Sequence, residues 1–245
     1  MDFSVMPALG RNGVVNLARK ISGSVLTGFR QVDPNATFVV GQIAKLAADA
    51  NGNPVATVCT HTATDIPVGI FWSHKTTSFY VPVVDEPITF TGSGSTVALK
   101  HANLKGTAGS YIRLSITANG GVDETYTTDY TANYVNGTIT HAGGGTVGAT
   151  ATVYVSYLYK DPNQSGIDTT LGAGKVVLLE DKGEIATRVY DSKAVFALTG
   201  DNGIIVVSPD GIPTTKTIQA TAPIIGKVTK VPTASDPELC FKFSI

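Results

Sequence analysis

The chain has few charged residues for its length. Lysine, arginine, aspartate and glutamate make up 15% of its 245 residues, whereas an average soluble domain has about 25%. The 18 basic and 19 acidic side chains give a formal net charge of −1. Binding to nucleic acid through phosphates requires a clear basic excess, so we expect no direct nucleic-acid binding. A nearly neutral, charge-poor surface favours association with other proteins.

Long apolar runs and export signals are also lacking. No apolar stretch approaches the ~18 residues of a membrane-spanning helix, so we expect no membrane partner. Residues 1–6 show no basic segment followed by an apolar one, which predicts no signal peptide. We therefore expect the two cysteines, Cys59 and Cys240, to be buried and reduced, although their positions leave a disulfide open.

The spacings typical of metal sites are absent. The four histidines form no HxH or HExxH pattern, and neither cysteine has a CxxC partner. We therefore predict no metal or cofactor, and we expect the histidines to be solvated or hydrogen-bonded surface residues. They are His61, His74, His101 and His141.

Glycine-rich stretches mimic two functional motifs. Residues 143–148 formally satisfy GxGxxG, but a strand pattern follows where a dinucleotide site needs a helix, so we predict a β-turn. Residues 91–95 (TGSGS) lack the GxSxG spacing of a nucleophile elbow, and we expect a hinge there.

Two adjacent carboxylate pairs are candidates for acid/base chemistry or calcium binding. They are Asp85-Glu86 and Glu180-Asp181. Neighbouring side chains of a strand point to opposite faces, so each pair is more simply a solvated edge or turn. We therefore assign no catalytic residue and expect a protein that is not an enzyme.

Alternating polar and apolar residues, interrupted by turn signals, predict an all-β fold. Asn51-Gly52, Asn136-Gly137 and Asp210-Gly211 are hairpin signals. Pro82 indicates that its strand lies at a sheet edge. Residues 38–70 recur in residues 196–228 with an offset of 157 to 159, which suggests a duplication or two halves of one barrel, with chance similarity of hairpins as the alternative.

A compositionally different block separates the two halves of this repeat. We therefore predict a split β-barrel or sandwich from residues 31–84 and 166–245, with a small β-sandwich from residues 85–165 inserted into it. Residues 1–30 carry four basic residues and one acid. They are expected to form an arm that orders against a neighbour or, equally, an edge strand of the outer domain.

Several of these stretches resemble virion structural proteins of tailed bacteriophages. The resemblance covers residues 200–205, 225–232 and 236–243, together with residues 40–46 and 65–70. Residues 129–140 and 153–157 of the insert are similar to β-modules of phage head and tail proteins. Among these proteins, the strand–turn–strand runs are most like those of capsid decoration, or cement, proteins.

This resemblance implies a homo-oligomer that binds the major capsid protein and its own copies. It would be assembled in the host cytoplasm and located on the capsid surface of the virion. Residues 1–30 and the final strand would make the contacts, and the insert would project outward. The alternative function is that of a tail tube or other tail protein. The second alternative is a carbohydrate-binding β-module in which Trp72, Tyr126 and Tyr130 are the candidate aromatic platforms for a sugar.

Overall fold

The computed structural model describes residues 18–22, 25–31, 36–71, 75–76, 80–160, 166–167 and 175–245. For residues 19–20, 22, 25–30, 75–76, 166–167 and 175–181 it describes the backbone alone. Its regular elements are β-strands and one short 3₁₀ turn, η2 (Asp201–Gly203). The predicted all-β class is confirmed. No helix in these ranges is long and apolar enough to cross a membrane.

The outer segments of the chain form one ten-stranded sheet. Eight strands follow the order β16-β15-β17-β18-β14-β5-β3-β4, and β1 and β2 pair with β14 beside this path. All the pairings are antiparallel. The strands are β1 (Ala18–Ser22), β2 (Val25–Gln31), β3 (Ile43–Ala48), β4 (Pro54–Val58), β5 (Pro67–Phe71), β14 (Lys175–Thr187), β15 (Ile204–Val207), β16 (Pro213–Thr215), β17 (Ile224–Lys230) and β18 (Leu239–Ser244).

The long strand β14 divides this sheet into two packed parts. Its residues 182–187 pair with β18 and β1, whereas its residues 175–181 pair with β2 and, at Leu178 and Leu179, with β5. Ile43 and Ile70 from one part share a buried core with Ile205 and Phe241 from the other. The described strands close no barrel, so the outer unit is an open, sandwich-like fold.

The internal repeat is present in the strand order. In the first half β3 pairs with both β4 and β5, and β5 pairs with β14. In the second half β15 pairs with both β16 and β17, and β17 pairs with β18. The two four-stranded units meet through the antiparallel pair β14–β18. This shared strand order favours a duplication over chance similarity of single hairpins.

The hairpin turns of the two units also share their hydrogen bonds at a constant offset of 159 residues. Gly52 N donates to Asp49 O (3.0 Å), and Gly211 N donates to Ser208 O (2.9 Å). The Asp49 carboxylate and the Ser208 hydroxyl each accept from the backbone four residues later. Both glycines have positive φ, 81° and 72°, which explains why the turn signals at these positions predicted the hairpins correctly.

The inserted segment forms a small β-sandwich of its own. One sheet has the order β7-β12-β9 and the other β10-β11-β8. Their shared core includes the fully buried side chains of Ile112, Leu114, Tyr130 and Tyr157. The strands are β7 (Tyr80–Thr89), β8 (Thr96–Ala98), β9 (Ile112–Ser115), β10 (Tyr130–Asn133), β11 (Thr138–His141) and β12 (Thr152–Lys160). Pro82 lies in β7, which is at a sheet edge as predicted.

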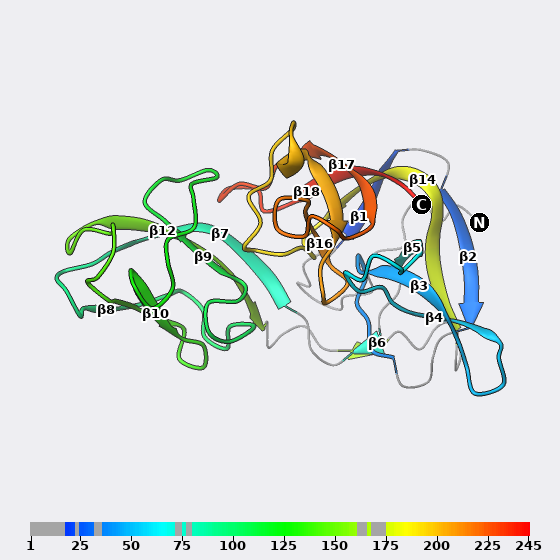
Figure 1. Cartoon of the computed structure of the whole chain (residues 1–245), viewed down its shortest axis with the longest axis horizontal. Coiled ribbons are helices and arrows are strands. Elements are labelled where there is room, and N and C mark those ends of the chain that lie inside the picture. The colour runs from blue at the N-terminus through cyan, green and yellow to red at the C-terminus, as the bar shows by residue number, and fades with distance from the viewer. Residues whose placement is uncertain are drawn as a thin grey trace.

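A two-stranded ribbon joins this sandwich to the outer unit. The chain enters through β6 (Lys75–Thr76) and β7 and returns through β12 and β13 (Gly166–Ile167). β7 pairs with β12, and β6 pairs with β13, both antiparallel. Figure 1 shows the sandwich, in green, at one end of the molecule and the outer sheets at the other. Close entry and exit points are the geometry that tolerates an insertion.

Of three further local expectations from the sequence, the hinge is wrong, and the edge-strand alternative for the first 30 residues is confirmed for β1 and β2. Residues 91–95 form no hinge, because Ser95 N donates to Gly92 O (3.1 Å) in a turn between β7 and β8. The final strand β18 lies inside the sheet with a partner on each side, so its backbone offers no free edge for contacts. Residues 18–22 and 25–31 form β1 and β2 against β14; residues 1–17 lie outside the described ranges.

Candidate functional site

Polar contacts link the inserted sandwich to the outer unit at one point. Lys105 Nζ lies 2.6 Å from an Asp210 carboxylate oxygen, and the hydroxyl of Tyr111 donates to the same oxygen. Lys105 comes from the loop before β9, Tyr111 precedes β9, and Asp210 lies in the turn between β15 and β16. The second repeat unit therefore presents its turn carboxylate directly to the insert.

Aromatic rings hold the lysine in place. Lys105 Nζ lies 4.3 Å from the ring centre of Tyr111 and 5.6 Å from that of Tyr80, within the range of a cation–π contact. The Lys105 N–H donates to Leu158 O at 2.8 Å. Tyr111 itself has φ of +57°, a conformation that non-glycine residues adopt at a cost. The surrounding contacts stabilise this conformation at the junction.

The electrostatics of the junction favour an ionised Asp210. Burial alone would raise its pKa, but the hydrogen bonds from Lys105 and Tyr111 and the charge of Lys105 lower the pKa below its usual value. For Tyr111, burial, together with the hydrogen bond to Asp210 and the negative charge of that carboxylate, raises the pKa far above the usual range. The tyrosine stays a neutral donor and the aspartate a charged acceptor.

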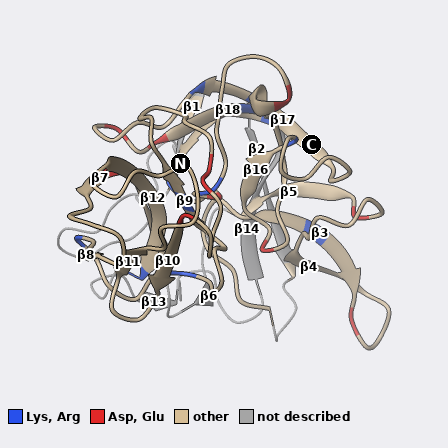
Figure 2. Cartoon of the chain, turned by 60° about the vertical axis from the view of Figure 1, so that its left-hand side comes forward, with Lys and Arg blue, Asp and Glu red and all other residues tan. Residues whose placement is uncertain are grey.

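A second group of contacts lies on the segment after β14. Ser192 Oγ donates to Tyr111 O at 2.5 Å. Lys193 Nζ lies 3.0 Å from a carboxylate oxygen of Asp123 and donates to Gly109 O at 3.3 Å. Figure 2 shows that charged residues are few along the ribbon, which is mostly tan. Two ion pairs, Lys105–Asp210 and Lys193–Asp123, therefore join the insert to the outer unit in a charge-poor molecule.

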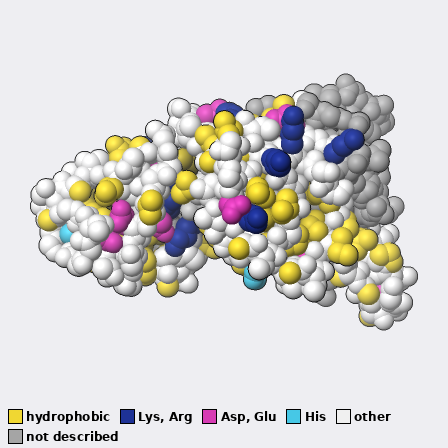
Figure 3. Space-filling view, turned by 45° about the horizontal axis from the view of Figure 1, so that its top comes forward, with side chains coloured by type: hydrophobic (Ala, Val, Ile, Leu, Met, Phe, Trp, Pro, Cys, Tyr) yellow, Lys and Arg dark blue, Asp and Glu magenta, His cyan; other side chains and the backbone are white. Residues whose placement is uncertain are grey.

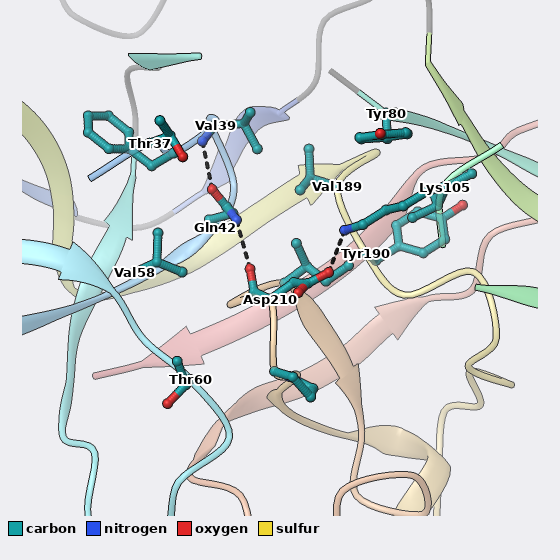
Figure 4. A pocket seen from close by; sticks show the side chains of 14 residues that line it. Thr37, Val39, Gln42, Val58, Thr60, Tyr80, Lys105, Val189, Tyr190 and Asp210 are labelled. Carbon is teal, nitrogen blue, oxygen red and sulfur yellow. Dashed lines mark hydrogen bonds and ion pairs between the residues drawn. The ribbon is translucent and has the colours of Figure 1, made fainter. Parts of the chain in front are cut away.

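An open pocket of about 440 Å³ lies beside Asp210 and Lys105. It is lined by both repeat units and by the insert, as Figure 4 shows. At its polar end Gln42 Nε2 donates to Asp210 O (2.7 Å), and Val39 N donates to Gln42 Oε1 (2.7 Å). The lining residues are Thr37, Phe38, Val39, Gln42, Val58, Thr60, Tyr80, Lys105, Leu158, Val189, Tyr190, Pro209, Asp210 and Ile212. No local sequence pattern predicts this pocket, because its lining residues are up to 175 positions apart in the chain.

The Asp85-Glu86 pair is buried, so the expectation of a solvated edge is wrong for it. Asp85 accepts from Arg113 Nη2 (2.9 Å), Ser156 Oγ (3.2 Å) and Asn119 N (2.6 Å). Glu86 points elsewhere and accepts from Tyr157 OH (2.6 Å) and Lys100 N (2.9 Å). The two carboxylates share no hydrogen-bond partner among these contacts. Each stabilises the insert; no carboxylate pair is formed.

A β-bulge explains the burial of Asp85. The register between β7 and β12 shifts opposite Ser156, and Asp85 has φ of +50°. A bulge turns an additional residue of an edge strand out of the regular alternation. This places the carboxylate over Arg113, whose side chain is also buried. For Glu180 and Asp181, in β14, the structure describes no side chain.

The expected burial or exposure of the cysteines and histidines is confirmed at some positions and wrong at another. Cys59 and Cys240 are buried and in no disulfide, as predicted. His61 is exposed as expected, whereas His141 is buried, with Nε2 2.9 Å from Val147 O, so the surface expectation is wrong there. His101 is partly buried and stacks on Tyr159, with ring centres 3.8 Å apart. His74 and Trp72 lie outside the described residues.

The glycine loop and the tyrosine platforms have structural roles. Residues 143–148 lead into β12 rather than a helix, and Gly145 has no room for a Cβ beside the Asp129 carboxylate, which accepts from Val147 N (3.1 Å) and Thr125 N (2.9 Å). Tyr130 is fully buried and packs edge-to-face with the partly buried Tyr126. Tyr130 therefore belongs to the core and is no carbohydrate platform.

Within the described ranges, no group of three or more histidine, cysteine, aspartate or glutamate side chains is arranged to hold a metal ion. The junction and its pocket are therefore the candidate functional site. No family model, curated protein or solved structure matches the chain.

Proposed function

We propose that the chain is a structural protein of a phage virion that decorates and stabilises the capsid shell as an oligomer. One observation carries the proposal: a small sandwich stands on a two-stranded ribbon at one end of an open, charge-poor pair of sheets. In such a scaffold the outer sheets can bind the capsid lattice while the inserted sandwich projects from it. The resemblance of its repeated strand–turn–strand segments to decoration proteins agrees with this arrangement.

Exposed apolar side chains on the outer unit supply contact points. Ile66, before β5, is 77% exposed, and Ile224, at the start of β17, is 59% exposed. On the face shown in Figure 3, apolar side chains are scattered over both ends of the molecule, and charged ones are few. Many modest contacts of this kind bind strongly when a lattice repeats them.

Co-sedimentation with capsid shells assembled without this chain tests the proposal. We expect the purified protein to bind at a copy number fixed by the shell lattice. I66D and I224D together should weaken this binding at least tenfold, because each puts a charge into an apolar contact. V135D is the matched control: Val135 is 71% exposed on the insert, at the end proposed to project from the shell.

Two outcomes contradict this function. Binding that does not saturate at a lattice-determined copy number rules out a decoration protein. Stacked rings formed by the purified protein alone, seen by negative-stain microscopy, favour a tail tube protein. If V135D weakens shell binding as much as the double variant does, the orientation proposed for the insert is wrong.

A further inference from the structure

The junction pocket has the dimensions and walls of a small-ligand site. Its volume of about 440 Å³ falls in the range of about 300–1,000 Å³ that is usual for such sites. Most of the lining side chains are apolar or aromatic, and Phe38, Leu158, Val189 and Ile212 are themselves buried. They line a recess that remains open without any rearrangement.

The polar groups of the pocket gather at one end and are already fixed. Asp210 is held by Lys105, by Tyr111 and, through its backbone oxygen, by Gln42. Figure 4 shows Asp210 with Gln42 to one side and Lys105 to the other, and with the apolar side chains of Val39, Val58 and Val189 around them. Preorganised polar groups beside an apolar wall orient a ligand with little loss of entropy on binding.

The charge of the lining determines which ligand fits. Lys105 and Asp210 are the charged residues among those that line the pocket, and they neutralise each other at 2.6 Å. Lys105 and Tyr111 both contact the same carboxylate oxygen of Asp210, Oδ2. Among the described residues Oδ1 therefore remains able to accept from a ligand, and Lys105 Nζ has further protons to donate. A neutral ligand group with a donor next to an acceptor can bond to both Asp210 and Lys105. A cationic ligand would be repelled by Lys105, and an anionic one by Asp210.

We propose that this pocket binds a small, uncharged, mainly apolar molecule with an amide-type donor and acceptor, its apolar body lying against Val39, Val58 and Val189. The site is independent of shell binding and goes beyond the structural role proposed above. Because its walls come from the insert and from both repeat units, the bound molecule also holds the insert against the outer sheets.

The experiment uses the full chain and the uncharged fluorophore N-phenylnaphthylamine, which has an apolar body and one N–H donor. We expect saturable binding with a fluorescence increase. Acetanilide, a neutral aromatic amide, should displace the fluorophore at concentrations at least tenfold below those of benzoate or benzylammonium, which have similar size but carry a charge. Stronger displacement by either charged compound overturns the proposed ligand class.

Substitutions in and outside the pocket test whether the fluorophore binds there. V39W fills the pocket and should abolish fluorophore binding, whereas V135W adds the same side chain at an exposed position of the insert that does not line the pocket, and should not. D210N should weaken acetanilide binding about tenfold, because it replaces a charged acceptor; D236N is its control. If V39W fails to fold, T37W at the exposed rim replaces it. Fluorophore binding equal in the pocket variants and their controls overturns the site.

Discussion

Asp210 is bonded to Lys105 across the junction, with Nζ 2.6 Å from its carboxylate, so the turn of the second repeat unit holds the insert. Because the pKa of Asp210 is lowered, the folded state favours its ionised form. The resulting stabilisation is present above the ordinary pKa near 3.8 and is lost as the pH falls through the folded value. The pair is partly exposed, so a contribution below about 1 kcal/mol is expected.

D210N should therefore lower the melting temperature at pH 7, and this effect should shrink progressively as the pH falls below 3.8. Hydrogen exchange at pH 7 should rise at Lys105, whose N–H is bonded to Leu158 O. D236N, which removes a surface pair with Lys230, should leave exchange at Lys105 unchanged. Equal exchange at Lys105 in wild type and D210N would show that the ion pair does not hold the insert.

The buried pair Asp85–Arg113 should contribute far more to stability. Both side chains are at most 5% exposed, and removing one partner of such a pair leaves an unpaired buried charge. We expect Arg113→Met to lower the free energy of unfolding by about 3–5 kcal/mol, measured by urea denaturation. Lys230→Met, at an exposed pair, is the control and should cost at most about 1 kcal/mol. Similar losses in the two variants would contradict this account.

The equivalent turn glycines of the two repeat units should differ in their tolerance of a side chain. Gly52 and Gly211 both have positive φ, so alanine costs roughly 1–2 kcal/mol at either position. A Cβ on Gly52 meets nothing within 4 Å, but one on Gly211 would lie 2.8 Å from Cys59 O and closer still to Val58. Overpacking of this kind adds about 1–3 kcal/mol.

G211A should therefore have a lower urea midpoint than G52A, with unchanged dependence on urea concentration. The comparison cancels the backbone cost, because the two turns share their conformation and hydrogen bonds. The remaining difference measures the packing of the second turn against the first unit, where Ile43 N donates to Gly211 O at 2.8 Å. Equal midpoints for the two variants would mean that this packing adapts without cost.

Local signals in the sequence predicted the strands and the repeat well. Asn51-Gly52 and Asp210-Gly211 impose a backbone conformation within four residues, so their effect can be read without the rest of the chain. Pro82 likewise marked an edge strand, because it lacks the N–H that an interior strand would use. These rules depend on neighbours in sequence and are insensitive to tertiary contacts.

The candidate site could not be predicted in the same way. Lys105 and Asp210 are far apart in sequence, and the hairpin signal at Asp210-Gly211 predicts a turn but no partner, so their pairing follows only from how the insert packs on the outer unit. His141 and Asp85 were expected at the surface because polar residues usually are. Val147 O, which contacts His141, and Arg113, which pairs with Asp85, make their burial favourable. Partners of this kind cannot be identified from a single sequence.

Cys59 should make the protein sensitive to alkaline pH. Burial, with a contribution from the nearby Asp65 carboxylate, raises the pKa of this thiol from 9.0 to about 12. Above pH 9 the unfolded chain therefore loses a proton that the folded chain keeps, and stability falls by up to about 1.4 kcal/mol per pH unit. Well below pH 9 the thiol is protonated in both states and has no such effect.

Urea denaturation at pH 8, 9 and 10 tests this expectation. The tyrosines with raised pKa values also contribute near pH 10, but they do so equally in the wild type and in a Cys59 variant. We expect the wild-type free energy of unfolding to fall slightly from pH 8 to 9 and more steeply from pH 9 to 10. Cys59→Ala should be less stable overall, since it leaves a cavity, but its decline over the same interval should be smaller. An equal decline in the two proteins would show that ionisation of Cys59 is not the cause.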